Sequence, residues 1–151
     1  MRVVVDTNVW VSAILTRTGP PGRVRTAFED DRFTVVTSEP LLVELAGVLT
    51  RPRLVRRYGH TPEDVAVLLG SLRALAELVP VTGNVRVCRD PNDDMVVETA
   101  INGHTDVLVS RDDDLKRAPE VAAVLSEPGI RVLSVQHFLD ALGEAEAQVN
   151  N

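Results

Sequence analysis

The stretch Val-Val-Val-Asp-Thr-Asn at residues 3–8 joins an uninterrupted apolar run to an acid. Consecutive valines without polar alternation are typical of a strand covered on both faces, as in a parallel sheet. The stretch Val-Leu-Val-Ser-Arg-Asp-Asp-Asp at 107–114 repeats this arrangement. Further strands are predicted at 33–37, 85–87 and 130–133, with amphipathic helical stretches between them, the last at 135–142. We therefore expect an α/β protein: a three-layer α/β/α fold with a central parallel sheet of about four to five strands flanked by helices.

The length and composition favour a globular protein. The chain has 151 residues, the size of one domain, and we expect that domain over residues 1–142 with a frayed C-terminal tail over 143–151. No apolar run approaches the roughly 20 residues that span a bilayer, which excludes a membrane protein. The single Cys88 cannot form an internal disulfide, and the few residues before Asp6 are too short for the apolar core of a secretion signal. We expect a cytoplasmic protein.

Acids follow the predicted strands at the edge where ligands bind in such sheets. Asp6 follows the first strand and Asp112 the strand at 107–109, so parallel strands bring both acids to one crevice. Glu44 and Asp94 each lie about 90–100° from the centre of the apolar stripe of a predicted helix, so both border the core. We expect these four carboxylates to converge.

Converging carboxylates repel one another, and burying them without compensation protonates them or costs several kcal/mol. A divalent cation removes both difficulties. Oxygen ligands without paired His or Cys select hard ions, and His60, His104 and His137 show no metal-ligand spacing. The sequence therefore predicts Mg²⁺, with Mn²⁺ as the alternative, and an ion held in this way serves phosphate chemistry.

Other acids have ordinary structural explanations. An acid after a strand is often a turn former or a helix cap. Asp90 and Asp93 have the spacing of an N-cap and its third helical residue, so we interpret both as structural. Asp113 is interpreted as a solvated turn residue.

The acidic blocks together resemble the PIN-domain family of Mg²⁺-dependent ribonucleases, in particular the VapC-like toxins of prokaryotic toxin–antitoxin systems. The resemblance rests on the block at 3–8, on Glu44, on Asp-Met-Val-Val-Glu-Thr-Ala at 94–100 and on Leu-Val-Ser-Arg-Asp-Asp-Asp-Leu at 108–115. It covers residues 2 to 138. It implies a PIN-like fold, metal-dependent hydrolysis of RNA phosphodiester bonds, a homodimer, and an antitoxin partner encoded separately.

The resemblance also implies roles for individual residues. Asp6, Glu44, Asp94 and Asp112 match the acidic quartet that holds one or two metal ions and carries catalysis. Asp114 matches a fifth acid of the same metal site. Asn8 and Ser110 match the positions that hydrogen-bond and orient these carboxylates.

Contacts to RNA are expected to involve phosphate rather than stacked bases, because aromatic residues make up only 3% of the chain. The densest basic cluster supplies the candidate RNA-binding residues Arg51, Arg53, Arg56 and Arg57. A solvated face or a partner-binding surface explains the same arginines equally well.

Two other functions are compatible with parts of the pattern. One is a non-catalytic RNA-binding or protein-interaction module on the same fold, against which the complete acidic quartet counts. The other is a Mg²⁺-dependent phosphatase of the haloacid dehalogenase type, which also begins with a strand ending in Asp. That family requires a second Asp where this chain has Asn8, and the only lysine is Lys116.

Taken by itself, the net charge of −6 argues against a nucleic-acid partner. Eight of the acids belong to the predicted crevice or its rim, which leaves 14 acids and 16 bases elsewhere. The acidity is therefore local, and we expect RNA binding to depend on divalent metal more than on a basic groove.

Overall fold

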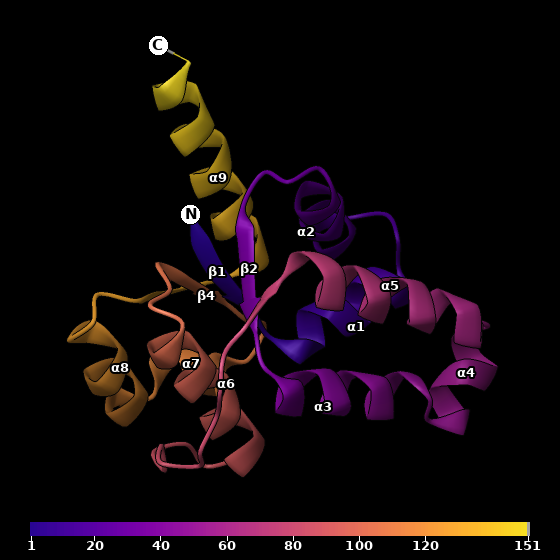
Figure 1. The fold of residues 1–151 in the computed structure, drawn as a ribbon, viewed down its shortest axis with the longest axis horizontal. Coiled ribbons are helices and arrows are strands. Elements are labelled where there is room, and N and C mark those ends of the chain that lie inside the picture. Colours follow the sequence, from indigo (N-terminus) through magenta and orange to yellow (C-terminus); the bar gives the residue numbers. More distant parts are fainter. Residues whose placement is uncertain (151) are drawn as a thin grey trace.

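The computed structural model describes residues 1–150, without the side chains of Asp113 and Asp114. In this part of the chain, parallel strands form a sheet of five in the order β3-β2-β1-β4-β5 (Figure 1). The strands are β1 (Arg2–Val5), β2 (Thr34–Thr37), β3 (Glu77–Leu78), β4 (Val107–Val109) and β5 (Arg131–Leu133). In the centre of the sheet Val5 pairs with Val109, so β1 and β4 end side by side. The predicted parallel sheet is confirmed.

Helices cover both faces of the sheet. They are α1 (Thr7–Leu15), α2 (Pro20–Glu29), α3 (Glu39–Leu49), α4 (Pro52–Tyr58), α5 (Pro62–Leu75), α6 (Pro91–Asn102), α7 (Asp113–Arg117), α8 (Pro119–Ser126) and α9 (Val135–Val149). Figure 1 shows α3, α4 and α5 together on one side of the molecule and α6, α7 and α8 on the other. In the described part of the chain, no helix is both long and apolar enough to cross a bilayer.

Alternate residues of β1 feed two separate apolar cores. Val3 and Val5 pack in a cluster that includes residues of α1, α2, α3, α5 and α9, whereas Val4 packs in a second cluster with residues of α6 and α8. The three valines are at most 3% exposed. The absence of polar alternation therefore reflects burial on both faces of the sheet. Asp6 follows directly after this buried strand and lies at the carboxyl edge of the sheet.

The predicted strand at 85–87 was wrong, because this segment belongs to the loop between β3 and α6. Its backbone N–H groups donate to carboxylates of α6 rather than to a strand: Val85 N to Glu98 at 3.3 Å and Val87 N to Asp94 at 2.9 Å. The edge strand is instead the two-residue β3, where Glu77 pairs with Val36. A two-residue strand is too short to show a periodic pattern.

The last helix continues well beyond the expected end at residue 142, since α9 reaches Val149. Phe138, Leu139 and Leu142 bury one face of its first half in the core. Its second half is joined to Arg32 by an ion pair from Glu146. Gly143 therefore does not end the helix.

Candidate metal centre

Asp6 occupies the carboxyl end of β1, where its backbone N–H donates to Val109 O at 2.9 Å. The residue is 6% exposed, and its Oδ2 accepts a hydrogen bond of 2.7 Å from the Ser110 hydroxyl. Burial raises the pKa of Asp6, the hydrogen bonds from Ser110 and the Thr7 backbone oppose that rise, and the charge of Asp112 adds to it. A buried carboxylate next to a second acid is poorly stabilised as an anion.

Ser110 links the ends of β1 and β4. Its Oγ donates to Asp6 and also accepts from the backbone N–H of Asp112 at 2.9 Å. Asn8 makes a weaker contact of the same kind, because its Oδ1 accepts from Arg111 N at 3.4 Å. Asn8 and Ser110 therefore lie where they hold the acid-bearing loop against the start of α1.

Asp93 on α6 shares a side-chain hydrogen bond with Asp112, which requires a proton between the two carboxyl groups. Burial, this hydrogen bond and the charges of Asp112, Asp6 and Asp90 raise the pKa of Asp93 to about 8. Asp90 caps α6 by accepting from Asn92 N at 2.9 Å, as expected, and its charge still acts on Asp93 and Asp6. The interpretation of Asp93 as only a capping residue was wrong.

Glu44 completes the group from α3. It is half-buried, and burial together with the negative charges of Asp6 and Asp90 raises its pKa, while Arg51 lowers it. The structure thus brings together Asp6, Glu44 and Asp112 from the predicted set, with Asp93 and Asp90 in addition.

Asp94 does not lie with these acids, although the sequence led us to expect it there. Its Oδ1 accepts hydrogen bonds from the backbone N–H groups of Val87 at 2.9 Å and Cys88 at 2.8 Å. The pKa of Asp94 is lowered overall, because these bonds and Arg86 outweigh burial. Adjacent helical residues differ by about 100° in direction, so Asp93 faces the sheet edge while Asp94 faces the loop.

The sequence pattern that describes the PIN domain matches residues 2–114, about three quarters of the chain. The chain belongs to the PIN domain family. A curated relative, the uncharacterized protein MJ1680 of Methanocaldococcus jannaschii, is 26% identical over 115 residues, which is 76% of this chain and 73% of the relative.

Two solved structures share the fold of this PIN domain. VapBC2 from Rickettsia felis, bound to a DNA fragment from their promoter, aligns with a TM-score of 0.54 and 17% identity over 89% of this chain and 98% of that one. FitAcB from Neisseria gonorrhoeae aligns with a TM-score of 0.50 and 14% identity over 89% and 99% of the two chains. At these identities the likeness extends to the fold alone.

The chemistry of the acid cluster suits a hard divalent ion. Its donors are carboxylate oxygens without His or Cys, and they lie along a half-buried edge where their charges disfavour one another. In the described part of the PIN domain, no three such side chains are gathered closely enough to hold an ion as they stand. The predicted ligand Asp114 lies outside the described side chains. Asp93 and Asp112 are hydrogen-bonded to one another, and a bound cation would compete with the proton that such a bond needs.

The predicted RNA-binding arginines divide into two groups. Arg51 is close enough to Glu44 to lower the pKa of that acid. Arg53, Arg56 and Arg57 belong to α4, which Figure 1 shows at the far end of α3 from the sheet. Arg57 stacks on Tyr58, with its guanidinium carbon 5.3 Å from the ring centroid. Among the described side chains, Arg51 is the member of this cluster whose charge acts on an acid of the site.

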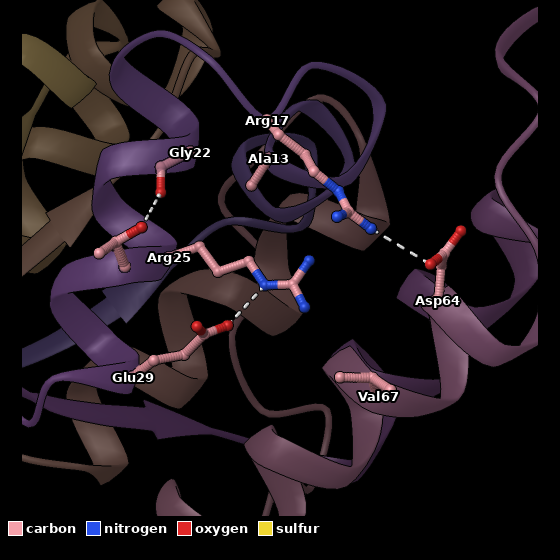
Figure 2. Close-up of a pocket in the computed structure, with 8 residues that line it drawn as sticks. Ala13, Arg17, Gly22, Arg25, Glu29, Asp64 and Val67 are labelled. Atoms are coloured by element: carbon pink, nitrogen blue, oxygen red, sulfur yellow. Dashed lines mark hydrogen bonds and ion pairs between the residues drawn. The ribbon is translucent and has the colours of Figure 1, made fainter.

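A hollow of about 330 Å³ between α1, α2 and α5 contains basic residues but none of the acids of the cluster at the sheet edge (Figure 2). Its two arginines are already paired with acids. Arg17 Nη2 is 3.2 Å from Asp64 Oδ1, and Arg25 Nε is 2.8 Å from Glu29 Oε1. Its charges are therefore balanced within the protein.

Proposed function

We propose that this PIN-domain protein is a divalent-metal-dependent endoribonuclease that hydrolyses RNA phosphodiester bonds, and that it is the toxin component of a toxin–antitoxin pair. One observation carries the proposal. Asp6 is buried beside other acids, and among the described residues no lysine or arginine forms an ion pair with it. Such a carboxylate has a physical reason to bind a cation.

Asp6, Glu44, Asp93 and Asp112 would hold Mg²⁺ or Mn²⁺, as one ion or two. Asp93 takes the role that the sequence resemblance assigned to Asp94, because Asp93 is the α6 acid that contacts Asp112. Asp114, on the short helix after Asp112, is proposed as a further ligand. Asn8 and Ser110 would orient the loop that carries Asp112.

When bound, a divalent ion supplies an activated water and offsets the charge that develops on the phosphorus during hydrolysis. The residues of this chain provide the positioning. Ser110 keeps Asp6 and Asp112 at a fixed separation through its two hydrogen bonds. Asp93 and Glu44 bring carboxylates from two different helices to the same edge, so α3 and α6 both border the place where the phosphate must lie.

The proposed partners follow from the family and from the structures it resembles. One solved neighbour is VapBC2, and the acidic blocks of this chain resemble the VapC-like toxins, which supports an antitoxin encoded separately as a partner of this chain. We further propose a homodimer that acts on RNA in the cytoplasm, with Arg51 contacting the RNA near the acids.

The test is to incubate the purified protein with single-stranded and structured RNA, in Mg²⁺, in Mn²⁺ and in chelator, beside Asp6→Asn. Metal-dependent cleavage that Asp6→Asn abolishes is the expected result. Equal cleavage by both proteins would mean a contaminating nuclease and would overturn the proposal. If no RNA is cleaved, the non-catalytic module is favoured, and release of inorganic phosphate from small monoesters would point to a phosphatase.

A further inference from the structure

A second hollow, of about 510 Å³, adjoins the acid cluster on the side of α9. It is bounded by the end of α1, the loop to α2 and the start of α2, the loop after β4, α7 and the first turn of α9. The lining residues that matter below are Pro20, Pro21, Arg111, Lys116, Val135 and Gln136. Ser110 is common to this hollow and the acid cluster, since it also donates to Asp6.

The charged side chains among the described residues that line this hollow are basic, unlike those of the acid cluster. Arg111 and Lys116 supply two cations, and no carboxylate is among the described residues that line it. Arg111 is fixed in place, because its Nη1 donates to Ser12 Oγ, which itself donates to Asn8 O at 3.0 Å. Among the described residues Arg111 forms no ion pair, in contrast to the paired arginines of Figure 2.

The first turn of α9 adds to this preference for an anion. Ser134 caps the helix by accepting from His137 N at 3.1 Å, and the N-terminal end of this 15-residue helix faces the hollow through Val135 and Gln136. The N-terminus of a helix carries partial positive charge. It therefore acts together with Arg111 and Lys116.

The remaining lining suits the rest of a nucleotide. Pro20, Pro21 and Val135 provide apolar surface, and several hydroxyls lie around it. The amide nitrogen of Gln136 donates to Asp140 at 3.0 Å, which fixes the side-chain orientation and leaves its carbonyl oxygen as an acceptor. The hollow thus combines phosphate-binding cations, a surface for a flat ring and a polar group that can distinguish ring edges.

We propose that this hollow binds one nucleotide of the RNA strand next to the bond that is cut, with its phosphate on Arg111 and Lys116 and its base between the prolines and Gln136. This inference rests on the proposed nuclease function and deepens it, because it names the place where the sequence around the cut is read. This placement also gives the path of the RNA, which runs from the acids past Ser110 toward α9.

The first test is kinetic and uses single-stranded RNA in the metal that supports cleavage. Arg111→Ala and Lys116→Ala are each expected to raise KM about tenfold, the scale of one charge-assisted hydrogen bond, with a smaller change in kcat. Gln136→Ala is expected to change which bases flank the cut sites when the products are sequenced. Arg131→Ala, which removes an exposed arginine at the opposite end of β5, is the matched control and should leave KM and the cut sites unchanged.

The second test requires no cleavage. AMP, CMP, GMP and UMP are titrated into the wild-type protein with Mg²⁺ while backbone amide resonances are followed by NMR. Shifts at Arg111, Val135 and Gln136 that differ among the four nucleotides are expected, and Arg111→Ala should weaken them. Inorganic phosphate that binds as tightly as the nucleotides and produces the same shifts would overturn the assignment of a nucleotide site.

The two tests separate this inference from the function on which it rests. Wild-type protein that cuts RNA, with unchanged KM and cut sites in all three variants and no nucleotide-dependent shifts, would overturn the subsite and leave the nuclease standing. Wild-type protein that cuts no RNA overturns the nuclease, and the titration then decides alone: shifts at the three amides uphold the nucleotide site, and their absence overturns it.

Discussion

Asp93 and Asp94 are neighbours in the sequence, yet they lie in opposite surroundings. Burial, a side-chain hydrogen bond with Asp112 and the charges of neighbouring acids raise the pKa of Asp93 to about 8. Asp94 accepts two backbone hydrogen bonds from the loop before α6, and its pKa is lowered. The protein itself stabilises the ionised form of Asp94, whereas the surroundings of Asp93 disfavour its ionised form.

Glu98, one turn after Asp94, shows the same contrast more strongly. It is 3% exposed and accepts from Asn84 N at 2.8 Å, from Val85 N, and from Thr82 N. A buried acid is thus no sign of a functional site in itself. The partners of the acid distinguish a structural carboxylate, surrounded by N–H donors, from one that is held ready for a cation.

The largest expected effect separates the two neighbours directly. Asp93→Asn removes a proposed metal ligand and should lower kcat/KM for RNA cleavage about a thousandfold, the upper range for loss of one electrostatic group in an active site. Asp94→Asn keeps an oxygen acceptor for the loop and should stay within about threefold of wild type. Cleavage rates per folded molecule measure both, and equal losses in the two variants would break the comparison.

The free energy of unfolding should depend on the acids that accept backbone hydrogen bonds more than on the acids of the cluster. Glu98→Ala leaves the N–H groups of the 82–85 segment without their acceptor and should lower the free energy of unfolding by about 3 kcal/mol. Glu44→Ala removes a carboxylate crowded by Asp6 and should leave stability in chelator unchanged or slightly higher. Denaturant unfolding of the two variants measures this difference, and a larger loss for Glu44→Ala would contradict it.

The dependence of stability on pH should also distinguish the two kinds of acid. The pKa of Asp93 is about 8 in the folded chain, against about 3.9 in the unfolded chain, so between these values the folded state binds more protons. The stabilisation of the folded state by protonated Asp93 is therefore complete below about pH 4 and is lost as the pH rises toward 8. In chelator we expect this loss to be about 1–2 kcal/mol, because solvent screens a half-exposed group.

Two comparisons test whether Asp93 causes this loss of stability. Asp93→Asn should remove this loss, and saturating Mg²⁺ should raise the stability of the wild type at pH 8. Asp94 has a lowered pKa, so its contribution is present above about pH 4 and is lost on acidification. Asp94→Asn should therefore leave the loss between pH 4 and 8 intact. A wild-type curve that is flat between these values in chelator would contradict the assignment.

The smallest effect concerns the arginines. Arg51 acts on Glu44, so Arg51→Ala should raise KM for RNA about two- to fivefold, as expected for one exposed charge. Arg56→Ala, on α4, is the control and should change KM less. Measurement at two salt concentrations separates a charge effect from a structural one, because only the former weakens with salt.

The sequence predicted the parts of this arrangement that depend on strands and strand ends. Asp6 and Asp112 follow runs of buried apolar residues, so parallel pairing alone brings them together. Glu44 borders an apolar stripe, which was enough to direct it toward the same edge. Helical periodicity could not choose between Asp93 and Asp94, because both lie near the margin of the buried face of α6.

The loop before α6 determines which of the two acids joins the cluster, because its N–H groups bind Asp94. The sequence of this loop has no periodic pattern from which its path could be predicted. Val85 and Val87 look like a strand because they are β-branched, whereas their N–H groups are satisfied by side chains of α6. The run Asp90–Asp94 gave no warning, because an N-cap acid with a second acid three residues later is the usual pattern of a capping box. Asp90 does cap the helix, whereas the carboxyl group of Asp93 is hydrogen-bonded to Asp112.

We propose that the acids at the sheet edge form a divalent-metal site to which Asp93 belongs and Asp94 does not. The decisive experiment is calorimetric titration of Mn²⁺ into the wild type, Asp93→Asn and Asp94→Asn at constant pH. We expect saturable binding with proton release in the wild type, the same binding within about threefold in Asp94→Asn, and at least a tenfold weaker affinity in Asp93→Asn. Unchanged affinity in Asp93→Asn, or loss of binding in Asp94→Asn, would show that this assignment of the metal ligands is wrong.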